Sequence, residues 1–553
     1  MCGINLIVDR TGKANLDALK HMMDKTVHRG PDQGRMKIIG KENYQVLFGV
    51  NRLRIMDENT DSDQPFHEKD EACFLLYNGE IYNQVEIRNH LIRKGIHFST
   101  FSDTEVLFHY LKENPLAASS GLHGMYAYVF IDFRKEVLAI ARDPWGMKPL
   151  YFYLDDRYFI VSSEIRGILA SGLVRSVLNV EQIPFYFRYR FSNPPNTLLK
   201  NIQTFMKGIT CRFGLDDFKL LQLDRSDNPP DENTEINPRE GYFDNIDDQK
   251  LLAEVEELLI DSMITHTQSV RSPGLFLSGG VDSTLLLALA ANHRIHLPNV
   301  FSIVNSDQDR DFGTEDYKYV RMAVQQYHPS SSIIEMDHSM MYGLDDFIGR
   351  IDHPVADPAF FLTYQLSALA SKTTNVVLSG AGADELFGGY NRHAAFYHYL
   401  QHRKKIKFFT PLIKNFLRVV PTGYSYVGRK NLLLLKKLFN KVTGEPWQTY
   451  DNFLSFEKLS PSVLSPEWDL TGMTDPVNQI FLLALERDRQ EYLPEDVLAV
   501  NDRACMLNSV EIRMPYLEEK VGSLIRRIRP DRLVSGGRKW ILKSLLKKHG
   551  GGR

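Results

Sequence analysis

The second half of this 553-residue chain is predicted to be an α/β domain built on a doubly wound parallel sheet. Short apolar runs typical of strands alternate there with helix-like segments: strands at 275–277, 300–304, 333–336 and 375–378, helices at 284–290 and 315–327. Two of the strands lead directly into glycine-rich turns, 278–283 and 379–390. Because such sheets bind ligands at the carboxyl ends of their strands, the two turns are predicted to lie side by side at a binding site.

The first turn reads Ser278-Gly279-Gly280-Val281-Asp282-Ser283 and opens a helix. Adjacent glycines let the backbone approach a ligand closely, and a helix N-terminus favours an anion. Asp282 would repel a bare phosphate, so it indicates a bridging divalent cation, Mg²⁺. The alternative is a Ser/Gly turn that merely caps a buried helix. The turn lacks the Gly-Lys-Ser/Thr ending of a Walker A loop, and it resembles the pyrophosphate-binding loop of ATP pyrophosphatases.

Composition describes an ordinary globular protein of two to four domains. The 66 Lys+Arg against 69 Asp+Glu give a net charge of −3, which favours neither a nucleic acid nor a membrane partner. The four scattered cysteines form no CxxC pair, which argues against a disulfide framework or structural zinc and indicates a reducing compartment. No apolar run has the length of a membrane span, and no signal peptide is recognisable, so a cytoplasmic location is expected.

The N-terminus, Met1-Cys2-Gly3, suits removal of Met1, which would leave Cys2 with a free thiol and a free α-amine. The amine can act as an intramolecular base for the thiol. Cys2 by itself favours the simpler interpretation of a small buried residue. Three further segments change this balance: a charged turn at 28–32, an amide beside a glycine at 77–83, and two carboxylates at 101–105. Within 77–83, Asn78 and Gly79 form a candidate oxyanion-binding pair.

With these segments, residues 2–214 resemble the class II glutamine amidotransferase domain of the asparagine synthetase family, an N-terminal-nucleophile hydrolase. The resemblance continues through 124–127, 142–151 and 163–164. It implies an αββα sandwich of the α+β class, in which Cys2 attacks the side-chain amide of glutamine and forms a thioester. Asn78 and Gly79 would then stabilise the tetrahedral oxyanion.

The same resemblance implies a set of glutamine-binding residues, with Arg52 for the α-carboxylate and Asp103, helped by Glu80, for the α-ammonium. Taken singly, Arg52 and Asp103 are more often surface ion-pair partners than ligands. A stretch rich in Asp, Asn, Pro and Glu, residues 215–249, is predicted to be a linker between this domain and a second one at 250–553.

The second domain resembles the ATP-pyrophosphatase (synthetase) domain of the same family. The resemblance rests on both glycine-rich turns, on 352–358, and on 501–503 and 511–518, which match late helical segments. It implies a helical C-terminal part and an ATP site made by Leu277, Ser278, Gly279, Gly280, Asp282, Ser283, Val304, Ser379, Gly380 and Lys539. Asp282 and Asp384 would hold Mg²⁺, so ATP and Mg²⁺ are the expected cofactors.

The implied reaction is acyl activation. A carboxylate attacks the α-phosphorus of ATP to give an acyl-adenylate and pyrophosphate, and ammonia from the Cys2 site, passed through an internal tunnel, displaces AMP. The expected partners are therefore glutamine and a carboxylate acceptor, aspartate by default. The sequence leaves open whether the chain forms a homodimer.

The chain departs from the family pattern at Ala381, where asparagine-forming members carry Glu or Asp. Loss of a candidate base is expected to matter, since such groups supply about 10²–10⁴-fold in rate. Glu385 is a candidate replacement from a different position. The C-terminus at 550–553 also comes sooner after Lys539 than the family pattern predicts. Two alternatives stay open: the same chemistry on another carboxylate in specialised metabolism, or a non-catalytic homologue that binds glutamine or nucleotide.

Overall fold

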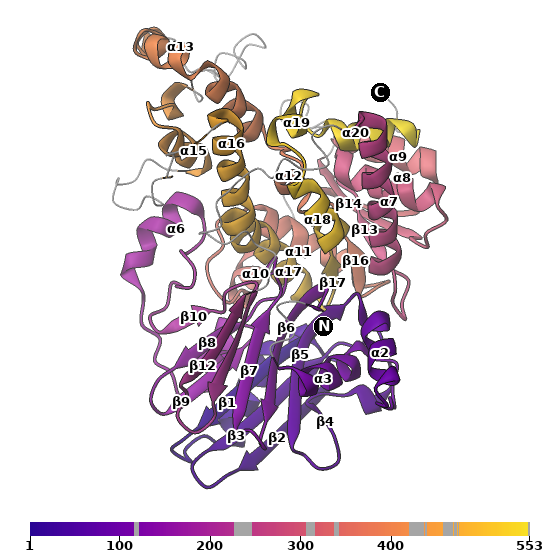
Figure 1. The fold of residues 1–553 in the computed structure, drawn as a ribbon, viewed down its shortest axis with the longest axis vertical. Helices are drawn as coiled ribbons and strands as arrows, with labels where there is room; N and C mark the ends of the chain where they lie inside the picture. The colour runs from indigo at the N-terminus through magenta and orange to yellow at the C-terminus, as the bar shows by residue number, and fades with distance from the viewer. Residues whose placement is uncertain are drawn as a thin grey trace.

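The computed structural model describes residues 1–115, 121–225, 246–305, 316–336, 342–419, 436, 439–456, 468, 473 and 475–550. Figure 1 shows the strands of the first half gathered at one end of the molecule and the helices of the second half at the other. The N-terminus lies where the two halves meet. The first residues of the chain are therefore at the junction between the domains.

The first half contains two six-stranded sheets whose paired strands run antiparallel. The first sheet has the order β10-β8-β9-β1-β3-β2, with β1 Cys2–Asp9, β2 Gln33–Gly40, β3 Gln45–Arg52, β8 Tyr151–Leu154, β9 Tyr158–Ser162 and β10 Ile202–Thr204. The second has the order β12-β11-β7-β6-β5-β4, with β4 Phe66–His67, β5 Cys73–Ile81, β6 Gly124–Asp132, β7 Val137–Arg142, β11 Ile209–Gly214 and β12 Leu220–Arg225.

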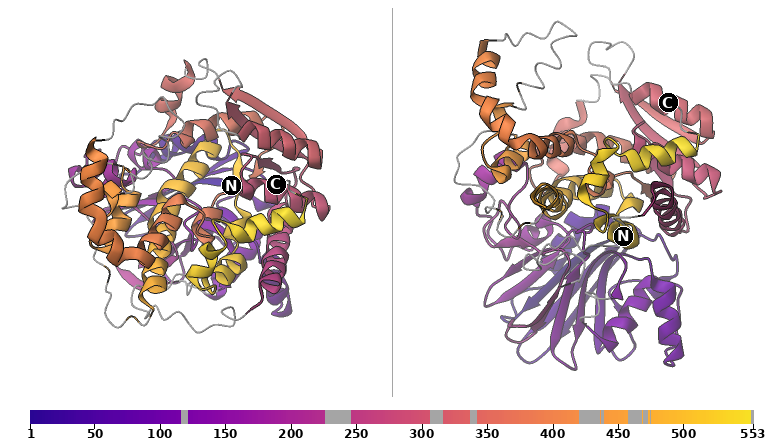
Figure 2. Two further views of the ribbon diagram at one scale, coloured as in Figure 1. Left: turned by 90° about the horizontal axis from the view of Figure 1, so that it is seen from above. Right: turned by 45° about the horizontal axis from the view of Figure 1, so that its top comes forward.

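The alternation of side chains along β1 explains how these sheets stack. Ile4, Leu6 and Val8 point into a core shared with the second sheet, while Ile7 joins the outer layer. Helices α1 (Leu16–Thr26) and α5 (Ile165–Ala170) cover that outer face, and α2 (Gln84–Arg93) and α3 (Asp103–Glu113) cover the outer face of the other sheet. Figure 2 shows the two sheets packed against each other. The predicted αββα sandwich is confirmed.

The second half is built on a five-stranded parallel sheet of order β15-β14-β13-β16-β17. Its strands are β13 Gly274–Phe276, β14 Asn299–Asn305, β15 Ser330–Met336, β16 Val376–Leu378 and β17 Glu511–Arg513. The strand order reverses between β13 and β16, which confirms the predicted doubly wound sheet. Crevices at such a reversal are where ligands of these sheets bind.

Helices cover this sheet and form the C-terminal part. In chain order they are α7 Asp248–His266, α8 Val281–Asn292, α9 Asp316–Tyr327, α10 Leu344–Arg350, α11 Ala359–Ala370, α12 Ala383–Leu386, α13 Asn391–Val419, α15 Pro446–Leu454, α16 Pro476–Arg487, a π-helical segment Asp488–Leu498, α17 Ala499–Met506, α18 Glu519–Arg526, α19 Pro530–Ser535 and α20 Trp540–Lys548. A further helix, α6 (Ile183–Tyr189), leads from the first domain toward them. Within the described ranges, none of the helices combines the length and apolarity needed to cross a bilayer.

Two segments differ from the sequence-based prediction. β12 lies inside the stretch predicted to be a linker, and it pairs with β11 at the edge of the second sheet, so the sheet extends to Arg225. Its side chains are mostly exposed, so it carries no apolar alternation that would mark it as a strand. Residues 226–245 of that stretch lie outside the described residues, and its last two residues, Asp248 and Gln249, already belong to α7. Glu511–Arg513, expected among helical segments, is strand β17, whose three residues are too few to show a period.

Buried ion pairs join the two domains. Arg29 donates to Asp502 at 2.9 Å, and the ammonium of Lys148 lies 3.5 Å from the other oxygen of the same carboxylate. All three side chains are almost completely buried. Beside them, Trp145 of the first domain packs against Gly522 of α18, where a Cβ would lie 2.7 Å from the indole ring. The interface therefore resembles a protein interior in both packing and charge pairing.

Candidate active sites

Cys2 is the first residue of β1 and is buried at the domain junction. Its backbone N–H donates to Asn78 Oδ1 at 3.0 Å, and Gln64 Nε2 lies 3.4 Å from its Sγ. Burial raises the pKa of the Cys2 thiol, although the nearby N-terminal ammonium and Arg52 act in the opposite direction. The thiol therefore needs a base to become a nucleophile.

Asn78 and Gly79 lie on β5 of the other sheet, where the side chain of Asn78 contacts Cys2. The Nδ2 of Asn78 is buried and has no hydrogen-bond partner, which is costly unless a ligand atom accepts from it. At Gly79 a Cβ would lie 2.1 Å from the carbonyl oxygen of Met125 on β6, so no side chain fits. The predicted oxyanion pair thus lies beside the nucleophile with an unused donor.

The predicted glutamine-binding residues line one cleft together with Cys2 and Gly79. Arg52 is oriented by Asp63 Oδ1 at 2.6 Å and by the carbonyl of Asp57 at 3.0 Å. Asp103 accepts from the hydroxyl of Tyr77 at 2.7 Å and from the N–H of Ile81 at 3.1 Å. Burial raises the pKa of Asp103, while these two hydrogen bonds oppose the rise. The cleft therefore presents a cation and a carboxylate to a ligand.

Glu80 connects this cleft to the second domain. Its Oε2 lies 2.5 Å from Arg513 Nη2, and Arg513 also donates to Glu511 at 2.6 Å. Burial, with the neighbouring carboxylates, raises the pKa of Glu80, and Arg513 opposes the rise. The backbone carbonyl of Arg513 accepts the N–H of Ser379 at 2.8 Å, in the second glycine-rich turn. One buried arginine therefore contacts both candidate sites.

The first glycine-rich turn is shaped by its own hydrogen bonds. Gly279 has a φ of +76°, which favours glycine, and Gly280 is the N-cap of α8. The hydroxyl of Ser283 accepts the N–H of Ser278 at 3.2 Å and lies 3.1 Å from the Ser278 hydroxyl. The turn is thus held open at a helix N-terminus, as an anion site requires.

The two glycine-rich turns meet. At Gly380 a Cβ would lie 3.0 Å from the Cβ of Asp282, so a larger residue would have to push the two turns slightly apart. Lys539, the N-cap of α20, places its ammonium 2.6 Å from Asp282 Oδ2 and 2.7 Å from Asp384 Oδ1. Residues 282, 384 and 539, far apart in the sequence, therefore form one charged cluster.

The charges in this cluster suit a divalent cation. Burial raises the pKa of Asp282 to about 6, an effect that Asp384 increases and Lys539 opposes. Burial lowers the pKa of Lys539, but the two carboxylates raise it overall. Asp282 Oδ1 is buried without a hydrogen-bond partner. An unused carboxylate oxygen beside a second carboxylate fits Mg²⁺, which prefers oxygen ligands.

The other predicted ATP-site residues lie at the same strand ends. Leu277 and Val304 are buried where β13 and β14 end, and Ser379 and Gly380 follow β16. Ala381 offers no carboxylate. Glu385 accepts from the hydroxyl of Tyr390 at 2.5 Å, and burial raises its pKa to about 7, so it is engaged elsewhere.

Sequence reasoning missed several residues that shape both sites. They are Gln64, Asp63 and Tyr77 around the cleft, Arg513 between the sites, and Tyr516, whose hydroxyl donates to the carbonyl of Asp282 at 2.9 Å. Tyr77 lies in the segment 77–83, and Arg513 and Tyr516 lie in 511–518, so the sequence marked their segments but not their individual roles. Their contacts depend on the fold of distant segments.

The fold and these two sites define a glutamine-dependent carbon–nitrogen ligase with an ATP-pyrophosphatase-type second domain. A profile described as "Glutamine amidotransferase domain" matches residues 1–222, and one described as "Asparagine synthase" matches residues 254–549. The chain belongs to the asparagine synthase family.

Three relatives illustrate the range of similarity. Glutamine-hydrolyzing asparagine synthetase 1 of Bacillus subtilis (strain 168) is 28% identical over 547 residues, which are 95% of this chain and 80% of the relative. A putative glutamine-hydrolyzing asparagine synthetase 2 of Methanocaldococcus jannaschii is 29% identical over 504 residues, 87% of this chain and 92% of the relative. Amidase chyE of Penicillium rubens is 25% identical over 425 residues, 71% of this chain and 60% of the relative.

Proposed function

We propose that the chain hydrolyses glutamine at Cys2 and uses the ammonia to convert a carboxylate, activated by ATP, into an amide. The observation that carries this proposal is the cluster of Asp282, Asp384 and Lys539, which unites both glycine-rich turns at the sheet's reversal point. The domains would be the predicted ones, 2–214 and 250–553, with the first extended by β12 to Arg225 and the second by the start of α7 at Asp248. The four cysteines, all buried and unpaired, support a reducing, cytoplasmic location.

In the first site, removal of Met1 would free the α-amine of Cys2, which takes the thiol proton. The Sγ atom attacks the amide carbon of glutamine, and the Nδ2 of Asn78 and the N–H of Gly79 donate to the developing oxyanion. Collapse of this intermediate expels ammonia and leaves a thioester, which water cleaves to glutamate. Arg52 and Asp103, with Glu80, would hold the two charged groups of glutamine.

In the second site, Asp282 and Asp384 would hold Mg²⁺, which supplies neutralisation of phosphate charge when bound. Lys539 would turn from the two carboxylates toward the phosphates, because its long side chain is flexible and its ammonium already lies at the site. The N-terminus of α8 would bind the pyrophosphate part of ATP. The carboxylate of the acceptor then displaces pyrophosphate, and ammonia displaces AMP.

The identity of the acceptor depends on the second turn. The names of the B. subtilis and M. jannaschii relatives support aspartate. Ala381, which offers no base, supports instead another carboxylate whose reaction needs none there, and the P. rubens relative bears a different name, amidase. We take aspartate as the default acceptor and another small carboxylic acid as the second candidate.

The test is pyrophosphate release from ATP with glutamine and Mg²⁺, in parallel with aspartate and a panel of other carboxylic acids. Release with aspartate supports asparagine formation. Release only with another acid overturns the acceptor but keeps the chemistry, and an Ala381→Glu variant should then gain aspartate-dependent release. No release with any acid overturns the proposal in favour of a binding protein.

A further inference from the structure

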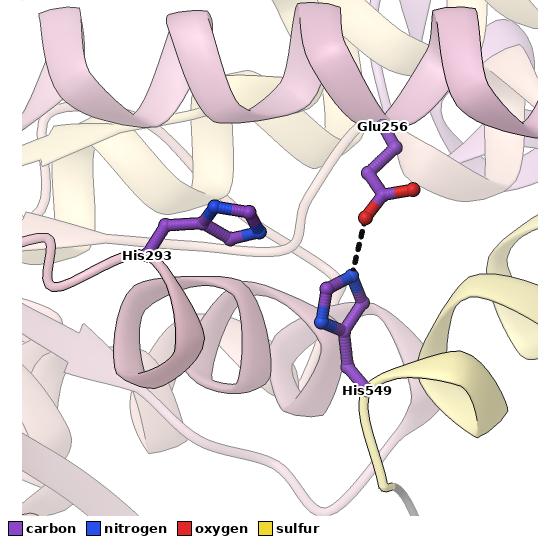
Figure 3. A group of neighbouring side chains, drawn as sticks. All are labelled: Glu256, His293 and His549. Carbon is purple, nitrogen blue, oxygen red and sulfur yellow. Dashed lines mark hydrogen bonds and ion pairs between the residues drawn. The ribbon is translucent and has the colours of Figure 1, made fainter.

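A group of metal-ligating side chains lies outside both candidate active sites. It consists of Glu256 on α7, His293 just after α8 and His549 just after α20 (Figure 3). One ligand atom from each residue lies within 4.8 Å of the others. Figure 3 shows the two imidazole rings and the carboxylate facing a common space. Glu256 is buried, whereas His293 is exposed, so the group can be reached from solvent.

Two of the three ligands are already fixed in orientation. His549 Nε2 lies 2.6 Å from Glu256 Oε1, and Asn292 Nδ2 lies 3.0 Å from the other ring nitrogen. The hydroxyl of Tyr327 on α9 donates to the carbonyl of His549 at 3.2 Å. The second oxygen of Glu256, Oε2, accepts a hydrogen bond from the ammonium of Lys548 at 2.5 Å. Glu256 and His549 are therefore already held close together, and a small movement of these side chains and of His293 would let all three bind one ion.

We propose that Glu256, His293 and His549 bind Zn²⁺ with a water molecule as the fourth ligand. Two imidazoles and one carboxylate are a donor set that Zn²⁺ accepts in tetrahedral geometry. The ion takes the place of the proton between His549 Nε2 and Glu256 Oε1, and this proton, the single N–H proton of the neutral ring, is transferred to Nδ1. Asn292 then turns its carboxamide so that the oxygen accepts from Nδ1, the arrangement that metal-bound histidines usually have.

The position of this site gives it a structural role. Helix α8 starts beside Asp282 and α20 starts after Lys539, so both begin at the phosphate cluster. Their 12 and 9 residues put their other ends about 18 Å and about 13 Å away, where the three ligands meet. An ion there ties α20 to α7 and α8, with which it packs. It would thereby fix the helix that carries Lys539.

The experiment is a titration of metal-free protein with Zn²⁺ in competition with a chromophoric chelator, in a Cys2→Ala background that removes the catalytic thiol. We expect one Zn²⁺ per chain, a higher unfolding temperature with Zn²⁺, and slower hydrogen exchange in α20. His293→Ala, at an exposed residue, should weaken binding by about 10-fold or more and remove both stabilising effects. Glu256→Gln should act in the same direction.

The matched control is His296→Ala, because His296 is exposed on the same loop and its Nε2 lies 2.9 Å from the hydroxyl of Ser272, away from the three ligands. This variant should bind like the parent protein. If the parent binds no Zn²⁺ up to roughly 100 μM, or if His293→Ala binds as tightly as His296→Ala, the site is an ion pair only and the proposal fails. Any stabilisation by Mg²⁺, which is proposed to bind at Asp282 and Asp384, should be the same in His293→Ala as in the parent protein.

Discussion

Among single residues, Glu164 illustrates how pairing overcomes burial. Its carboxylate lies 2.7 Å from His28 Nε2, 2.6 Å from Arg166 Nε and 3.4 Å from Arg29 Nη1. Burial by itself would raise the pKa of Glu164, but these three partners lower it to about 2. In the unfolded chain Glu164 has the ordinary pKa of 4.5, so the charged carboxylate of Glu164 stabilises the folded state above about pH 4.5.

This stabilisation should be lost as the pH falls from about 4.5 to about 2, since the folded state must then accept the proton that the unfolded state already holds. At pH 7, Glu164→Gln should lower the free energy of unfolding by about 3 kcal/mol, the equivalent of the pKa difference. Thermal unfolding of both proteins between pH 7 and pH 2 measures the effect. A stability difference that stays constant down to pH 2 would contradict the assignment.

Cys2 is the second residue whose role can be isolated. Cys2→Ala should abolish glutamine-dependent pyrophosphate release and leave ammonia-dependent release intact, because the second site does not contact the thiol. Glutamate formation provides the direct measurement. Cys211→Ala, a buried cysteine of the same domain outside the cleft, is the control and should change neither rate. Surviving glutamine turnover in Cys2→Ala would assign the nucleophile to another residue.

At the scale of elements, the strands that carry a glycine-rich turn could be predicted from the sequence, because an apolar run followed by such a turn is a local signal. β13 and β16, which precede the two turns, lie within a few residues of the predicted ranges, and so do β14 and β15, which were predicted from their apolar runs. β12 and β17 were not predicted, since β12 is exposed and β17 takes its place only by pairing with β16. Their pairing partners, rather than their own sequences, make them strands.

The contact between the two glycine-rich turns yields a prediction about these elements. Gly380→Ala would put a methyl group 3.0 Å from Asp282 Cβ and from the N–H nitrogen of Ser283, so the two turns must move apart by a few tenths of an ångström. Because a displacement of about 1 Å at reacting groups costs about 10²-fold in rate, this smaller shift is expected to lower pyrophosphate release by roughly 3- to 10-fold. Glutamine hydrolysis should persist. Gly349→Ala, where a Cβ meets nothing, is the control, and equal activity of both variants would place the turns outside the active site.

At the scale of the whole molecule, the sequence indicated two domains and their individual sites but not how they are joined. Arg29 and Asp502 are separated by 473 positions, and neither belongs to a pattern that names the other as its partner. The same holds for Glu80 and Arg513. Such pairs form only when both domains are folded, so they follow from the docking of two surfaces. We expect transfer of ammonia between the two proposed sites to depend on this docking.

Asp502 is the residue through which the docking can be tested. Asp502→Asn would leave Arg29 and Lys148 buried without their shared anion, and breaking a buried pair in this way costs about 3–5 kcal/mol. The interface should loosen, so that ammonia escapes and glutamate formed per pyrophosphate released rises above the parent ratio, while ammonia-dependent release is retained. Glu113→Gln is the control, because it breaks the Lys94–Glu113 pair, a solvent-accessible contact within the first domain that contributes little. If the ratio of glutamate to pyrophosphate in Asp502→Asn stays at the parent value, as it should in Glu113→Gln, the seal between the sites does not depend on this buried charge.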